Sequence, residues 1–154
     1  MIELVYETHS LTTDNEAGIA TGWIPGLLSE RGRAAAQALG ERRRDDGIEV
    51  VFTSDLRRAV ETAEIAFAGS GLPVRRDPRL RECNYGELNG RPVAEIDAQR
   101  LRRVETPFPG GESYHDVCRA HSELPRRPGT GRAVARPRDR PFCESLGDRA
   151  SPRR

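Results

Sequence analysis

The first half of the chain alternates between two apolar patterns, and this alternation is the strongest constraint on the fold. Short apolar runs rich in strand-forming residues occur at residues 2–6 and 48–53 and, more briefly, at residues 72–74. Between them, at about 29–44 and 54–67, apolar residues recur every three or four positions, as on one face of a helix. Strands separated by helices pair in parallel through right-handed crossovers. The sequence therefore predicts an α/β fold built on a parallel sheet.

Serine residues mark the expected starts of the first two helices, because a serine side chain can accept a hydrogen bond from the first helical turn. Ser29 precedes the first of these helices and Ser54 precedes the second. Farther along, residues 80–90 are expected to form a loop, residues 93–104 a third helix and residues 112–120 the start of another.

The loop after the first predicted strand holds the first candidate for chemistry. His9 lies there among hydroxyl, carboxyl and amide side chains that continue to Asn15. Open α/β sheets bind ligands at the carboxyl ends of their strands, and a neutral imidazole can attack phosphorus or carry a proton. We therefore expect His9 to belong to any active site, the alternative being a structural histidine.

Two further places could contribute to such a site. Arg57 and Arg58 follow Ser54 at the entrance of the second predicted helix, where free N–H groups favour an anion. Only one of the two can point into a cleft, and we expect Arg57 to be the exposed one. Glu82, with Glu87 nearby, could give a proton to a leaving group; a solvated loop carboxylate is the alternative.

The overall composition excludes several function classes. A net charge of +1 gives no field directed at nucleic acid or a membrane, and no apolar run is long enough to span a bilayer. Because no signal peptide is recognisable and the three cysteines show no C-x-x-C spacing, we expect reduced thiols and a cytoplasmic location. Every basic side chain is arginine, which is typical of a GC-rich gene.

Four motifs in order resemble the histidine phosphatase superfamily, the phosphoglycerate-mutase-like proteins. Residues 8–15 correspond to the family's R-H-G-x-T-x-x-N, and residues 109–113 match its P-G-G-E-S. The family's S-x-L-x-R-A-x-x-T and L-x-E-x-x-x-G are matched by Ser54, Leu56, Arg58, Ala59 and Thr62, and by Leu80, Glu82 and Gly86.

This resemblance implies a three-layer α/β fold with a mostly parallel sheet and helices on both faces, of which the C-terminal part is expected to be incomplete. It also implies that His9 accepts a phosphoryl group, that Glu82 is the acid/base, and that Arg58, Asn15 and Ser10 bind the substrate phosphate. The implied activity is that of a phosphomonoesterase or phosphomutase acting on a small phosphorylated metabolite, with no metal or other cofactor.

The chain departs from the family pattern at important positions. Thr8 stands where the family has arginine and Ser10 where it has glycine, while the family's second catalytic histidine has no counterpart. His121 is not preceded by an apolar strand and is not assigned that role, and His115 is expected on the surface. The alternative function is therefore a catalytically impaired or non-catalytic relative that binds a phosphorylated ligand.

The pattern changes again near Arg119. Residues 1–118 are expected to form the α/β domain, whereas residues 119–154 are rich in arginine and proline and are expected to be disordered or out of frame. Residues 138–145 can be written in codons that, after loss of one base, encode V-I-G-H-S-A-S. Nucleic-acid binding by this basic tail is disfavoured, because no aromatic residues are interleaved with its arginines.

Overall fold

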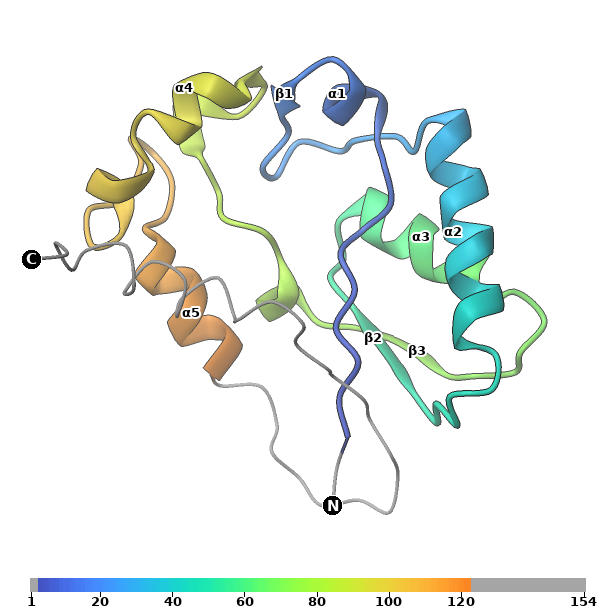
Figure 1. Cartoon of the computed structure of the whole chain (residues 1–154). Coiled ribbons are helices and arrows are strands. Elements are labelled where there is room, and N and C mark those ends of the chain that lie inside the picture. The colour runs from blue at the N-terminus through green and yellow to red at the C-terminus, as the bar shows by residue number, and fades with distance from the viewer. Residues whose placement is uncertain (1–2, 123–154) are drawn as a thin grey trace, which may run out of the picture.

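The computed structural model describes residues 3–122 (Figure 1). Its α-helices are α1 Thr13–Glu16, α2 Glu30–Arg43, α3 Arg57–Ala66, α4 Val93–Asp97 and α5 Tyr114–Ser122. Its strands are β1 Ile19–Ala20, β2 Val51–Thr53, β3 Val74–Arg76 and β4 Arg91–Pro92. Short 3-10 helices cover Pro78–Leu80, Gly86–Leu88 and Arg100–Arg103.

The unit β2–α3–β3 confirms the predicted parallel α/β arrangement. Val51 pairs with Val74 and Thr53 with Arg76 in a parallel register, and α3 forms the crossover between the two strands. Helix α2 packs against α3 at Gly40, where an added Cβ would lie 1.9 Å from the carbonyl oxygen of Ala66. The two helices therefore approach each other as closely as their backbones allow.

Helix starts agree with the sequence in one case and differ in the other. The hydroxyl of Ser29 accepts a hydrogen bond from the N–H of Gly32 at 3.1 Å, so Ser29 caps α2 as predicted. The prediction that Ser54 caps the next helix is wrong. Helix α3 begins at Arg57, and its N-cap is Leu56, which makes no side-chain cap bond. Ser54 is buried two residues earlier.

The other half of the structure packs around aromatic side chains. Strands β1 and β4 pair antiparallel, and the adjoining core contains Ala20, Cys83, Tyr85, Ile96, Phe108 and Tyr114. The third predicted helix is divided into α4 and a 3-10 helix at residues 100–103. Helix α5 continues through Ser122, so the first four residues of the predicted tail are helical. The rest of that tail lies outside the described residues.

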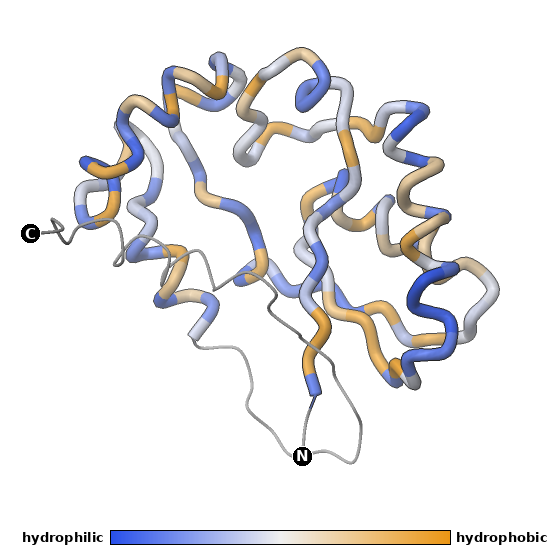
Figure 2. The backbone as a smooth tube through the Cα atoms, in the orientation of Figure 1, coloured by the Kyte–Doolittle hydropathy of each residue, from blue (hydrophilic) through white to orange (hydrophobic). Residues whose placement is uncertain are grey.

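The N-terminal segment differs most from its prediction. Residues 3–8 run between the two halves of the molecule (Figure 1), with only an isolated bridge at Leu4 instead of a strand. Leu4 and Tyr6 are 55% and 70% exposed, and Figure 2 shows apolar residues near this end of the chain and along β2. A strand requires ladder partners, which this stretch lacks within residues 3–122.

Cys83 is free and buried, and burial raises the pKa of its thiol to about 12. Within residues 3–122, none of the helices combines the length and the apolar character needed to cross a membrane.

Candidate active site

His9 is fixed in space by the residue that follows it. The N–H of Ser10 donates to the hydroxyl of Thr62 on α3 at 2.9 Å, and the Ser10 hydroxyl donates to the carbonyl of Gly32 on α2 at 2.6 Å. An added Cβ at Gly32 would lie only 1.9 Å from the carbonyl oxygen of Leu11. Helices α2 and α3 therefore hold the loop that carries His9. Position 32 must be glycine, because the backbone of α2 lies against the backbone of Leu11 there.

The imidazole of His9 is in the form that a nucleophile needs. Its Nδ1 lies 2.7 Å from the carbonyl oxygen of Ser10. Because a carbonyl only accepts, Nδ1 carries the hydrogen and Nε2 keeps its lone pair. Burial is the main cause that lowers the pKa of His9 below 6.5, and the positive charge of Arg58 also lowers it. The ring is therefore neutral near pH 7.

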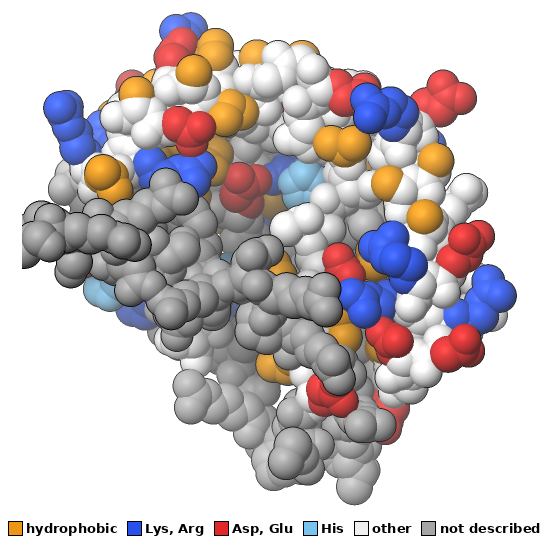
Figure 3. All heavy atoms as spheres, in the orientation of Figure 1, with side chains coloured by type: hydrophobic (Ala, Val, Ile, Leu, Met, Phe, Trp, Pro, Cys, Tyr) orange, Lys and Arg blue, Asp and Glu red, His pale blue; other side chains and the backbone are white. Residues whose placement is uncertain are grey.

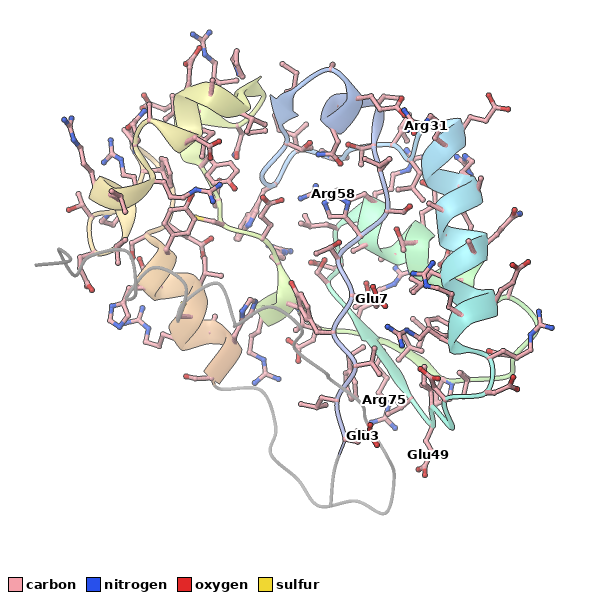
Figure 4. All side chains as sticks on the ribbon, in the orientation of Figure 1. Glu3, Glu7, Arg31, Glu49, Arg58 and Arg75 are labelled. Atoms are coloured by element: carbon pink, nitrogen blue, oxygen red, sulfur yellow. The ribbon has the colours of Figure 1, made fainter. Side chains whose placement is uncertain are left out.

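Arg58 is the charged centre of the site. Its side chain is 1% exposed, in contrast to the exposed Arg57, and it lies on α3 toward the interior of the molecule (Figure 4). Its Nη2 donates to the carbonyl of Gly22 at 2.7 Å and its Nη1 to the carbonyl of Ile24 at 3.2 Å. Its Nε has no hydrogen-bond partner in the described part of the chain. Arg58 thus holds the 21–26 loop and keeps one N–H donor unused.

Glu82 completes the charged cluster. Its Oε2 accepts from Nη2 of Arg58 at 2.9 Å, and its Oε1 accepts from the hydroxyl of Tyr85 at 2.8 Å. The indole N–H of Trp23 donates to the main-chain carbonyl of Glu82 at 2.8 Å. The side chain of Glu82 is 41% exposed, so it can exchange protons with solvent or with a bound molecule.

A cavity of about 520 Å³ adjoins His9. His9, Ser10 and Asn15 line it together with Thr8, Thr62 and the side of α2 that includes Ala35 and Leu39. Figure 3 shows a hollow on this face of the molecule in which histidine, acidic and basic side chains lie close together.

Asn15 lines the cavity and also takes part in the capping box at the start of α1. Its Oδ1 accepts from the N–H of Thr12 at 3.1 Å, and the hydroxyl of Thr12 accepts from the N–H of Asn15 at 3.0 Å. Asn15 is thereby held in place, with one of its acceptor positions already occupied.

The structure arranges the five predicted site residues in two groups that meet at His9. His9, Ser10 and Asn15 share the cavity, whereas Arg58 and Glu82 form an ion pair outside its lining. The charges of both Arg58 and Glu82 act on the His9 ring. His115 is exposed beside Glu105, as expected for a surface residue.

The sequence did not predict the roles of Tyr85 and Trp23. Tyr85 follows Glu82 by three residues, and no apolar periodicity indicates that its hydroxyl turns back to the carboxylate. Trp23 lies in a loop between β1 and α2, where it is partly covered by the guanidinium of Arg81, 4.3 Å from the ring centroid. Loop contacts of this kind depend on tertiary packing.

Comparisons with known proteins identify the family of this chain. The family model of the histidine phosphatase superfamily (branch 1) matches residues 8–127. A 2,3-bisphosphoglycerate-dependent phosphoglycerate mutase of Streptococcus thermophilus (strain ATCC BAA-491 / LMD-9) is 32% identical over 157 residues, covering 99% of this chain and 64% of the mutase. The corresponding Bifidobacterium longum (strain DJO10A) enzyme is 39% identical over 99 residues, which is 61% of this chain and 40% of that enzyme.

Solved structures show the same relationship. A mycobacterial glucosyl-3-phosphoglycerate phosphatase in complex with VO3 is 37% identical and superimposes with a TM-score of 0.64, covering 73% of this chain and 59% of that one. The α-ribazole phosphatase of Shigella flexneri is 27% identical with a TM-score of 0.64, over 74% and 60% of the two chains. The chain thus spans between 40% and 64% of the length of these four relatives. It has their α/β fold and belongs to the histidine phosphatase superfamily.

Proposed function

We propose that this protein is a phosphomonoesterase or phosphomutase that forms a phosphohistidine on His9, with a small phosphorylated metabolite as its substrate. The observation that carries the proposal is the state of His9: a neutral ring, its Nδ1 bonded to the Ser10 carbonyl, beside a cavity and an Arg–Glu pair. The phosphoglycerate mutase and the glucosyl-3-phosphoglycerate phosphatase described above act on phosphorylated compounds, which supports this class of substrate. We propose the cytoplasm, where such metabolites are held, as its location.

In the proposed first step, the Nε2 lone pair of His9 attacks phosphorus while the bond from phosphorus to the leaving oxygen breaks. Protonated Glu82 gives its proton to that oxygen. Phosphate oxygens replace the Glu82 carboxylate on Arg58 and also bond to the unused Nε–H, so that the guanidinium stabilises the transferred charge. Asn15, on the cavity wall, donates its amide N–H to a further phosphate oxygen, and Ser10 does so once its hydroxyl turns away from the carbonyl of Gly32.

In the second step, a water attacks the phosphohistidine and the phosphorus–nitrogen bond breaks. Glu82 takes a proton from that water, inorganic phosphate leaves, and His9 is restored to its neutral form. A phosphomutase would instead return the phosphoryl group to a second hydroxyl of the substrate. No step of either cycle requires a metal or another cofactor.

A second candidate function is binding of a phosphorylated ligand with little or no turnover. The observation that favours it is Thr8, which lines the cavity where the family has arginine. Hydrogen bonds to a charged group contribute about 1.5–3 kcal/mol each, so loss of a bidentate arginine costs roughly 100-fold or more in rate.

Hydrolysis of a generic aryl phosphate by the wild type and by His9→Ala separates the two functions. A phosphatase gives a wild-type rate well above that of the variant. Equal background rates, together with retained vanadate binding, would reject the enzyme and support the binding protein. Acid-labile ³²P label on the wild type and its loss in His9→Ala would identify the phosphohistidine directly.

A further inference from the structure

Glu82 is restrained at three points, two of which concern its carboxylate. Arg58 bonds to Oε2 and Tyr85 to Oε1, while Trp23 bonds to the main-chain carbonyl. Each hydrogen bond to a carboxylate oxygen restricts rotation of the carboxyl group, and two such bonds restrict it more than one. In the proposed reaction, however, the substrate phosphate takes over Arg58. The hydroxyl of Tyr85 then remains as the side-chain contact that orients Glu82.

The hydrogen bond from Tyr85 to Glu82 comes from a side chain that is held rigidly and stays protonated. Its side chain is buried, with its ring edge-on to that of Phe108 at a centroid distance of 5.2 Å. Phe108 is in turn edge-on to Tyr114 at 5.9 Å. Burial and the neighbouring Glu82 charge both raise the pKa of Tyr85, so its hydroxyl keeps its hydrogen at any working pH. A rigid side chain whose hydroxyl keeps its hydrogen donates a hydrogen bond in a fixed direction.

We propose that Tyr85 is a positioning residue for the acid–base step: its hydroxyl holds Oε1 of Glu82 in the orientation needed for proton transfer after the substrate has displaced the carboxylate from Arg58. Tyr85 acts through Glu82 and does not itself exchange a proton. This inference rests on the proposed function of Glu82.

The test compares Tyr85→Phe with Tyr114→Phe. Both variants remove one hydroxyl from the same buried aromatic cluster and keep the ring. They differ in their effect on Glu82, because its two carboxylate oxygens bond to Arg58 and Tyr85, and Tyr85→Phe removes the second of these bonds. The first measurement is a ¹³C NMR pH titration of the Glu82 carboxyl without substrate. The second is kcat and KM with an aryl phosphate, and thermal unfolding shows whether each variant is folded.

In Tyr85→Phe we expect the Glu82 titration midpoint to move up by roughly one pH unit, because a bond to the charged form has been removed. We also expect kcat to fall at least about tenfold with KM changed less than about twofold. Tyr114→Phe should leave both nearly as in the wild type. An unmoved midpoint, equal effects in the two variants, or a moved midpoint with an unchanged kcat would each overturn the proposal.

The NMR titration also separates this inference from the proposed function. If the wild type does not turn over any aryl phosphate, the enzyme proposal fails by the His9→Ala comparison. The titration then still decides the Tyr85 assignment: a shifted Glu82 midpoint in Tyr85→Phe supports the bond, and an unshifted one rejects it.

Discussion

Replacement of Arg58 by alanine should destabilise the folded chain by about 3 kcal/mol. Arg58 donates three hydrogen bonds, to the carbonyls of Gly22 and Ile24 and to Glu82. A bond from a charged donor contributes about 1.5–3 kcal/mol. We count only the two carbonyls at the low end of that range, since Glu82 is 41% exposed and regains water when its partner is removed. By the same reasoning, Arg57→Ala should cost less than about 0.5 kcal/mol, because that side chain is exposed.

Urea unfolding measures this difference, with fluorescence of Trp23, the single tryptophan of the chain, as the signal. Because its indole bonds to Glu82, the signal comes from the site itself. Vanadate binding should weaken at least about tenfold in Arg58→Ala and change little in Arg57→Ala. A larger effect of Arg57→Ala in either assay would show that the assignment of the two arginines to the inside and outside of α3 is wrong.

Three further predictions follow from the geometry of the site. The pKa of His9 is lowered in the folded chain, so on acidification the imidazole of the unfolded chain binds a proton first. The free energy of unfolding should therefore fall as the pH drops below about 6.5, and it should fall less in His9→Gln. Unfolding at about pH 7.5 and at about pH 5 checks this. Gly32→Ala and Gly40→Ala should each lower the free energy of unfolding by at least about 2 kcal/mol, because the added methyl group clashes with a carbonyl oxygen. Only Gly32→Ala, which lies beside the His9 loop, should also lower aryl phosphatase activity beyond its effect on folding. Glu82→Gln should abolish turnover yet tighten vanadate binding several-fold, because the carboxylate that competes for Arg58 is gone; weaker binding would contradict the proposed exchange of partners.

The parts of the fold that the sequence predicted are those governed by local rules. Helix α2 begins at its capping serine as predicted, although the face that it buries is formed by Gly32, Ala36 and Leu39, and Ala34 and Ala35 of the expected apolar stripe are exposed. The parallel pair β2–β3 follows from apolar runs on either side of a helical pattern. The start of α3 was misplaced because Ser54 has the residue type of a cap, while the backbone turns into the helix only at Leu56. The strand expected at residues 2–6 depends on neighbours that an apolar run cannot specify.

The candidate site shows the same division. Motif spacing identified His9, Arg58 and Glu82, and helix phase distinguished Arg58 from Arg57. It could not show that Arg58 is fully buried against the carbonyls of Gly22 and Ile24, because that contact joins a helix to a distant loop. The hydroxyl bond from Tyr85 to Glu82 was missed for a similar reason, since it depends on a turn whose conformation has no sequence period.

The last prediction concerns the reading frame beyond about Arg119. Parallel sheets are normally buried on both faces, and two strands alone are marginal in water. In the part of the chain that the structure describes, the apolar residues of the N-terminal segment and the β2–β3 pair are strongly exposed: Leu4 by 55%, Tyr6 by 70%, Phe52 by 47% and Val74 by 38%. Within residues 3–122, no other element covers these side chains fully.

The neighbouring frame of the tail can supply a covering element. Residues 122–131 permit an amphipathic helix, residues 134–137 permit the apolar sequence L-L-V-L, and residues 138–145 permit V-I-G-H-S-A-S. Burial of a large apolar side chain contributes about 1.5–3 kcal/mol, so covering four that are about half exposed should add roughly 4 kcal/mol. A frame-restored chain should therefore unfold at higher urea concentration than the present chain and hydrolyse aryl phosphate faster. Sequencing the gene across codons 115–154 decides the matter first, because the prediction fails if the shifted frame encodes no G-H-S.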